Sequence, residues 1–105
     1  KWFEETENCN YMLRSVLVKP EQAEKIKSVV HQDNTCRVQT VRKELNSNFY
    51  KLINAFNNET GIPMLLNTSL NGGGQPIFAT RAQCIEFFNN TDIDALCMGN
   101  TLLKK

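Results

Sequence analysis

Apolar and polar residues are arranged along two early segments in patterns that predict β-strands. Residues 11–18 (YMLRSVLV) are rich in large apolar and β-branched side chains. Residues 35–41 (TCRVQTV) alternate strictly between two sides, as a strand with one polar face does. Cys36 then lies on one side of this strand, and Arg37 and Gln39 lie on the other.

Two later segments have the period of a helix. Four apolar residues recur at the spacing of one helix face, namely Phe49, Leu52, Ile53 and Phe56. Gly61 is well placed to end this helix, and Pro63 prevents its continuation. Thr80 and Gln83 have the capping-box spacing, which predicts a second helix through Phe88.

Short strands and turns are predicted around these helices. Residues 64–66 have the pattern of a buried strand, and the Asn-Gly-Gly-Gly run at 71–74 is the strongest turn signal. Residues 76–79 are expected to return as a strand, and residues 95–98 and 101–103 to form a final pair. Strands that alternate with two main helices predict an α/β or α+β domain with a mixed, twisted sheet.

The length and net charge of the chain exclude several classes of protein. The 105 residues make one small domain at most, and 12 basic against 11 acidic residues leave a net charge of +1. That balance does not favour broad binding to nucleic acid or to an anionic membrane. No apolar run approaches the roughly 18 residues that cross a bilayer. The opening Lys-Trp-Phe-Glu-Glu resembles neither a start nor a signal peptide, so we expect a piece of a longer protein.

The cysteines and sequons bear on the cellular compartment. The four cysteines form no Cys-x-x-Cys pair and lie far apart, at Cys9, Cys36, Cys84 and Cys97. Zinc and thioredoxin-like sites need close pairs, so neither is expected. The even number of cysteines leaves a secreted disulfide framework as an alternative, but 41% hydrophobic residues can supply a core without disulfides, so we expect buried, reduced thiols. Three N-glycosylation sequons, at Asn58, Asn67 and Asn89, occur in an asparagine-rich chain where chance matches are expected. These features predict a cytoplasmic protein.

The stretch from residue 65 to residue 77 (LLNTSLNGGGQPI) carries the most informative chemistry. A predicted strand runs into Asn67, Thr68 and Ser69 and then into the glycine-rich turn. Exposed N–H groups in such a turn form an anion-binding concavity, and glycine permits close approach of the anion. No Gly-Lys-Ser/Thr follows, so this is not a P-loop. A plain hairpin turn fits the same pattern.

Arg37 is the second candidate, because its planar guanidinium matches a phosphate or carboxylate in two-point contact. A solvated arginine at a strand edge is the alternative. A single histidine, His31, cannot build a multi-histidine metal site, and Asp33 is interpreted as a turn residue. Core packing or contact with the missing upstream chain explains the N-terminal aromatic residues better than nucleic-acid stacking does; these are Trp2, Phe3 and Tyr11.

Four segments, in this order and spacing, resemble the C-terminal region of the O-carbamoyltransferases, the nodulation-factor, cephem and tobramycin type. They are HQDNTCRVQTV at 31–41, FYKLINAFNNETGIPMLLNTSLN at 49–71, GQPI at 74–77 and TDIDAL at 91–96. The opening WFEE and NYML are similar to the preceding segment of the family. The likeness covers almost the whole chain.

The resemblance implies a two-domain enzyme. A YrdC-like domain would use carbamoyl phosphate and ATP with Mg²⁺ to make carbamoyladenylate. A second domain, which carries a metal, would pass the carbamoyl group to a hydroxyl of a small-molecule acceptor. This chain would be the C-terminal part of the YrdC-like domain, with the upstream domains as its partners. It would hold no metal site and show no turnover alone.

The resemblance also assigns residues. Arg37 matches the arginine of the Arg-Val-Gln motif, which grips the phosphate or carbamoyl end of the ligand, and Asn67 and Ser69 match the Asn-Thr-Ser motif. Arg37 and Ser69 are the predicted catalytic residues, because they would supply charge and fixed donors as pyrophosphate leaves. Gly73 and Gly74 complete the predicted substrate-binding set.

The chain departs from the family pattern at three positions. Gln75 stands where glutamate is usual, which puts a charge-dependent role there in doubt. Asn34 replaces a glycine, although asparagine also tolerates a left-handed turn. Leu70 replaces a phenylalanine. The alternative to a carbamoyltransferase is a non-catalytic module of the same fold that binds a ligand or nucleic acid or has a structural role.

Overall fold

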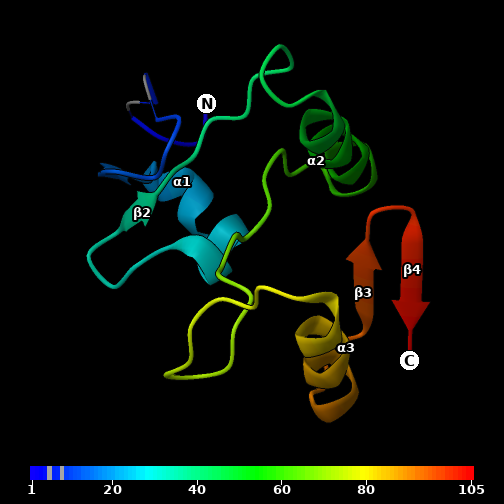
Figure 1. The fold of residues 1–105 in the computed structure, drawn as a ribbon. Coiled ribbons are helices and arrows are strands. Elements are labelled where there is room, and N and C mark those ends of the chain that lie inside the picture. The colour runs from blue at the N-terminus through cyan, green and yellow to red at the C-terminus, as the bar shows by residue number, and fades with distance from the viewer. Residues whose placement is uncertain (5, 8) are drawn as a thin grey trace. The chain divides into compact units, whose positions relative to one another are not determined.

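A computed structural model describes residues 1–4, 6–7 and 9–105 (Figure 1). Glu5, which belongs to the opening WFEE match, lies outside the described residues. The chain divides into two units, Lys1–Leu66 and Asn67–Lys105, and each is described by itself. None of the helices in the described ranges is long and apolar enough to cross a membrane.

The first unit contains a two-stranded antiparallel sheet. β1 (Ser15–Leu17) pairs with β2 (Thr35–Arg37) in a register that sets Val16 opposite Cys36. Because successive side chains point to opposite faces, Val16 and Cys36 are both buried while Arg37 is exposed. The predicted two-sided character of the second strand is confirmed.

Both strands are shorter than the patterns at 11–18 and 35–41 predict. Met12 has a left-handed φ of 54°, which is incompatible with extended backbone, and the neighbouring Leu13 is almost fully exposed. At the other strand the ladder ends after Arg37. The chain then pairs once more, through the amide of Thr40, with the N-terminal segment instead of with β1.

The core of this unit gathers where the sheet meets the first helical turns. α1 (Pro20–Ala23) continues directly into a 3₁₀ helix, η1 (Glu24–Val29). The buried cluster of Val18, Ile26 and Cys36 is surrounded by partly buried apolar side chains, namely Trp2, Phe3, Ala23, Val29, Val30, Val38, Ile62 and Met64. Trp2 and Phe3 therefore pack as predicted. Tyr11 does not pack in this core, since it is 76% exposed, and its alternative role as a contact with the upstream chain stays a prediction.

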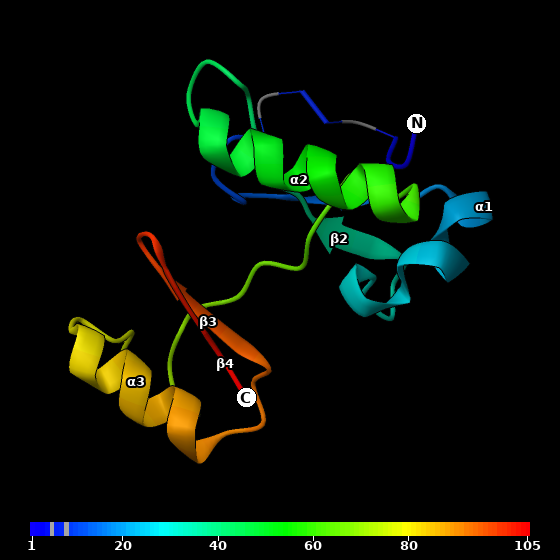
Figure 2. The ribbon, with the colours of Figure 1, turned by 90° about the vertical axis from the view of Figure 1, so that its right-hand side faces the viewer.

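The helix predicted from Phe49 onward is confirmed as α2 (Ser47–Thr60), which runs without a break (Figure 2). The side chain of Asn46 caps its first turn by accepting a hydrogen bond from the Phe49 amide at 3.1 Å. Gly61 ends the helix with a left-handed φ of 74°. Leu52, on the apolar face, remains 55% exposed.

The second unit consists of one helix and a hairpin. The predicted capping box is present at α3 (Arg81–Asn90), where Thr80 and Gln83 bond reciprocally. β3 (Ala95–Met98) and β4 (Thr101–Lys104) pair antiparallel, as their sequence predicts.

Aromatic residues form the small core of this unit. Phe88, on α3, is buried, and Lys105 lies 5.3 Å from the centre of its ring. The rings of Phe78 and Phe87 pack with their centres 5.1 Å apart in a tilted arrangement. These contacts hold the segment that precedes α3 against the helix.

The strands predicted at 64–66 and 76–79 are absent from the described structure. Leu66 and Ile77 are 61% and 67% exposed, and neither segment pairs with a described strand. The described strands therefore form two separate antiparallel pairs and not the mixed sheet that was predicted, because a mixed sheet needs these segments as partners. The α+β class itself is confirmed.

All four cysteines are free thiols. Cys9 and Cys36 are buried as predicted, and burial raises the pKa of the Cys36 thiol, which keeps it protonated. The prediction of burial is wrong for Cys84, which is half-buried, and for Cys97, which lies exposed on the two-stranded β3–β4 hairpin.

The Gly61→Ala variant is expected to lower the free energy of unfolding by about 1 kcal/mol, because alanine resists a left-handed φ. Urea unfolding of the chain measures this. Gly73→Ala is the matched control. An added Cβ meets no atom within 4 Å at either glycine, and of these two residues only Gly61 has a positive φ. The control should stay within about 0.5 kcal/mol of the parent. Equal losses in the two variants would contradict the backbone explanation.

Candidate functional site

Arg37 projects from the exposed face of β2 and is held in place by the main chain. Its Nε and Nη2 donate to the carbonyl oxygen of Met12 at 3.3 and 3.1 Å. This contact uses one edge of the guanidinium plane. The other edge, formed by Nη1 and Nη2, makes no hydrogen bond or ion pair to the described residues. Such an edge matches two oxygens of a phosphate or carboxylate.

The chain just after Arg37 also holds the N-terminal segment. Gln39 Nε2 donates to the carbonyl oxygen of Asn10 at 3.1 Å, and the amide of Thr40 donates to that of Cys9 at 2.8 Å. The polar side of β2 and of its extension therefore has a structural role that the sequence did not predict. Arg37 combines such a structural contact with an unoccupied donor edge.

Asp33 organises the turn that leads into β2. Its Oδ1 accepts hydrogen bonds from the Thr35 hydroxyl at 2.7 Å and from the Thr35 amide at 3.0 Å. These two bonds lower the pKa of the Asp33 carboxyl below its usual value. The interpretation of Asp33 as a turn residue is confirmed. Asn34 takes the left-handed position, with a φ of 60°, where the family pattern has glycine.

The glycine-rich segment is a loop held closed by hydrogen bonds from the side chain of Asn71. The Asn71 side-chain amide donates to the carbonyl oxygens of Gly72 and Gln75 at 3.2 and 2.8 Å. The amide of Gln75 donates to the carbonyl of Gly72 at 3.0 Å. Asn71 therefore organises the loop, whereas the sequence pattern predicted it only as part of a turn. The Asn-Gly pair at 71–72 is the sequence signal that could have identified this role.

Ser69 lies at the start of this loop with its hydroxyl already engaged. Its Oγ donates to Asn71 Oδ1 at 2.5 Å. Because a serine hydroxyl has one proton, Ser69 presents acceptor lone pairs to a ligand in this arrangement. A donor role toward an anion would require the hydroxyl to leave Asn71. Asn67, which precedes it, is exposed.

Gly73 and Gly74 form the exposed tip of the loop. A Cβ added at either residue would meet no atom within 4 Å, and Gly74 has a left-handed φ of 75°. Their amides donate no hydrogen bond to the described part of the chain. Exposed successive amides of this kind suit an anion. Anion binding by this loop stays a prediction.

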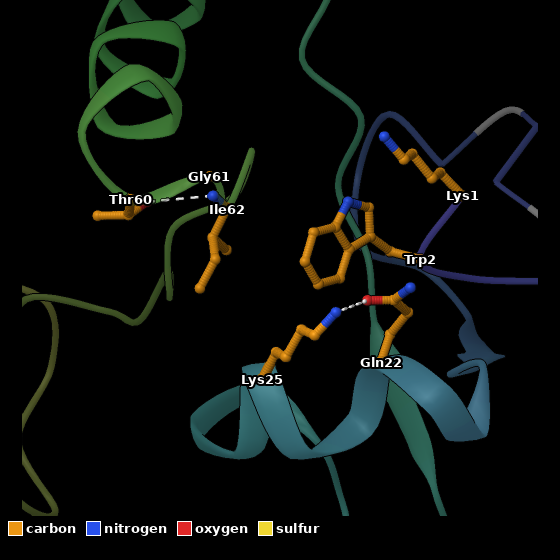
Figure 3. Close-up of a pocket in the computed structure, with 7 residues that line it drawn as sticks. All are labelled: Lys1, Trp2, Gln22, Lys25, Thr60, Gly61 and Ile62. Atoms are coloured by element: carbon orange, nitrogen blue, oxygen red, sulfur yellow. Dashed lines mark hydrogen bonds between the residues drawn. The ribbon is translucent and has the colours of Figure 1, made fainter.

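Two surface hollows, each of about 530 Å³, have linings that include none of the predicted site residues. The hollow in the first unit is lined by Lys1, Trp2, Gln22, Lys25 and the turn at 60–62 (Figure 3). Within it, Lys25 Nζ donates to Gln22 Oε1 at 3.3 Å. The hollow in the second unit is lined by Gln75, Pro76, Phe78, Gln83, Glu86, Phe87 and Asn90.

The predicted site residues fall in both units. The first unit sets Arg37 on the same face of β2 as Thr35. The second unit brings Ser69, Gly73 and Gly74 into one loop closed by Asn71. No group of three or more His, Cys, Asp or Glu residues within the described ranges is arranged to hold a metal ion.

Comparison with known proteins identifies the family. The family model described as "Carbamoyltransferase C-terminus" matches residues 1–105. The chain is 44% identical over 78 residues to the nodulation protein NolNO of Sinorhizobium fredii, covering 74% of this chain and 12% of that protein. The chain therefore belongs to the carbamoyltransferase C-terminus family, and the resemblance found in the sequence is confirmed.

Two further relatives agree with this assignment. Nodulation protein NolO of Bradyrhizobium diazoefficiens is 35% identical over 100 residues, which cover 95% of this chain and 18% of the relative. The 3'-hydroxymethylcephem-O-carbamoyltransferase of Amycolatopsis lactamdurans is 32% identical over 76 residues, 72% of this chain and 15% of the relative. The chain thus spans less than a fifth of the length of these curated relatives.

The Asp33→Asn variant is expected to be less stable than the parent at pH 7, and the difference is expected to be smaller near pH 2. The folded-state pKa of Asp33 lies below the unfolded value of about 3.9, so its contribution is present above that value. It is lost as the pH falls through the folded pKa. Urea unfolding at the two pH values tests this, with Asp92→Asn as the control. A stability loss of the same size at both pH values would contradict the role assigned to the carboxylate.

Proposed function

We propose that this chain supplies the C-terminal part of an ATP-dependent O-carbamoyltransferase. In this proposal a complete YrdC-like domain binds carbamoyl phosphate and ATP with Mg²⁺ and forms carbamoyladenylate. Another part of the full-length protein then transfers the carbamoyl group to a hydroxyl acceptor. The observation that carries the proposal is the family match over all 105 residues. The chain alone is expected to show no turnover.

Arg37 is the residue proposed to bind the phosphate or carbamoyl end of the ligand. Support comes from its free guanidinium edge and from the contact with Met12, which already orients the guanidinium plane. A pre-oriented cation stabilises developing negative charge with little reorganisation. Adenylation develops such charge on phosphate as pyrophosphate leaves.

The glycine-rich loop is proposed to add neutral donors. The amides of Gly73 and Gly74 would bind anionic oxygens, with Asn67 and Ser69 beside them. Mg²⁺ would be held mainly by the ATP phosphates and by residues outside this chain, since the described residues offer no cluster of metal ligands. No side chain of this chain is assigned as a general base.

Arg37→Ala in the full-length protein is expected to raise the KM for carbamoyl phosphate about 10- to 100-fold, the usual effect of losing a charge-assisted hydrogen bond. Arg37→Lys should recover only part of the loss, because an ammonium lacks the two-point edge. Steady-state kinetics of carbamoyladenylate formation measures both.

Arg14→Ala is the matched control for this variant. Arg14 Nη2 donates to the carbonyl oxygen of Glu7 at 2.5 Å, so its removal also takes away a contact between an arginine and the N-terminal main chain. The KM of the control should stay near that of the parent. If Arg14→Ala and Arg37→Ala raise the KM equally, Arg37 has only a structural role.

Ligand binding by the isolated chain is tested by an amide NMR titration with carbamoyl phosphate and then with ATP and Mg²⁺. Shifts are expected at Arg37, Gly73 and Gly74, which offer exposed donors, and at the neighbouring Gly72. Chemical-shift changes on adding short RNA that weaken with salt, with none for carbamoyl phosphate, would instead favour the nucleic-acid-binding alternative.

A further inference from the structure

His31 lies at the end of a hydrogen-bond chain that runs through Thr35 to Asp33, and the available donors and acceptors determine the direction of each bond. Asp33 is ionised at neutral pH, so its Oδ1 only accepts. The Thr35 hydroxyl, 2.7 Å away, therefore donates its single proton to Asp33. Toward His31 Nδ1, at 3.0 Å, the same hydroxyl oxygen acts as an acceptor. His31 Nδ1 must then carry a proton.

This arrangement leaves a lone pair on the other ring nitrogen of the neutral imidazole. A neutral imidazole has one N–H, and when Nδ1 carries it Nε2 is an acceptor. The ring is exposed, and Nε2 makes no hydrogen bond to the described residues. His31 therefore presents a fixed acceptor to solvent, whereas Arg37 presents only donors.

The acceptor of His31, Nε2, and the donor edge of Arg37 are both linked to the same face of the β1–β2 sheet. Thr35 and Arg37 are two residues apart in β2, so their side chains leave the same face about 6.6 Å apart. His31 is tied to Thr35 by its side chain and by its amide, which donates to the Thr35 carbonyl at 2.8 Å. The paired residues of β1 on this face, Ser15 and Leu17, leave it exposed.

We propose that His31 is a specificity-determining residue, whose Nε2 accepts a hydrogen bond from the –NH₂ of a carbamoyl group while Arg37 binds the phosphate oxygens of the same ligand. This inference rests on the proposed function. The His31 contact would let the exposed face of β2 distinguish a carbamoyl group from another acyl group. Asp33 and Thr35 are positioning residues, because they act by holding the imidazole and its tautomer.

Acetyl phosphate is the ligand that isolates this contact. It carries a methyl group in place of the –NH₂ and keeps the phosphate that Arg37 would bind. An acceptor that faces a methyl group loses its hydrogen bond, so the site should disfavour acetyl phosphate. The ratio of the two inhibition or Michaelis constants therefore reports the His31 contact, while the absolute affinity reports Arg37.

The tautomer is measured directly in the 105-residue chain, which has one histidine. A long-range ¹H–¹⁵N correlation spectrum of the neutral imidazole should show the proton on Nδ1. Thr35→Val should move the population toward the Nε2–H form, because valine cannot accept from Nδ1. A parent spectrum with the proton on Nε2 would overturn the inference.

Ligand preference is measured in the full-length protein. The His31→Ala variant should lower the preference for carbamoyl phosphate over acetyl phosphate about tenfold, the value of one lost hydrogen bond. His31→Gln should retain part of the preference, because a carboxamide oxygen also accepts. Thr35→Val should lower the preference with little change in acetyl phosphate affinity. Gln32→Ala, at an exposed neighbour, is the control and should change neither constant.

The outcomes separate this inference from the proposed function. If the parent prefers carbamoyl phosphate and His31→Ala keeps that preference, the role of His31 is overturned and the carbamoyltransferase proposal stands. If the parent binds neither phosphate, the proposed function fails and the inference fails with it. A tenfold loss in His31→Ala with partial recovery in His31→Gln supports both.

Discussion

The pairing of β2 with β1 is the contact on which the candidate site depends. Its register places Cys36 in the core beside Val18 and Ile26, and the period of two then turns Arg37 to the exposed face. A slip of one residue would bury the guanidinium and expose the thiol, at the cost of desolvating a charge. The apolar core therefore determines which face of the strand presents the arginine to solvent.

The side chains on the exposed face of β2 make structural contacts and are also the ones proposed to bind a ligand. The contact between Arg37 and Met12 ties the N-terminal segment to the strand and also orients the free guanidinium edge. Thr35 accepts from His31 and donates to Asp33, so one hydroxyl both closes a turn and determines a histidine tautomer. A side chain held by such contacts meets a ligand with less loss of conformational entropy.

The glycine-rich loop in the second unit is also held in place by hydrogen bonds from its own side chains. Asn71 donates to two carbonyl groups of the loop, and these hydrogen bonds hold the loop closed. The amides at Gly73 and Gly74 donate to no residue of the described structure. Gln75 folds back toward Gly72, where an added Cβ would lie 2.7 Å from its Oε1. The glycine at position 72 thus makes room for the side chain of Gln75.

The sequence by itself determined the elements that depend on near neighbours. The end of α2 at Gly61, the capping box of Thr80 and Gln83 and the two faces of residues 35–37 were all predictable, because each rests on interactions within a few residues. The family assignment was predictable for a different reason, since motifs in a fixed order are specific even without a structure.

Only the tertiary structure decided what distant residues do to one another. Residues 64–66 have the composition of a strand but no partner strand, and pairing is not encoded in a single segment. The carbonyl of Met12, 25 positions away in the sequence, accepts hydrogen bonds from one edge of the Arg37 guanidinium, and only that contact shows which edge stays free. Sequence patterns record the preference of each residue for burial and local geometry, whereas the partners of a side chain are set by the folded chain.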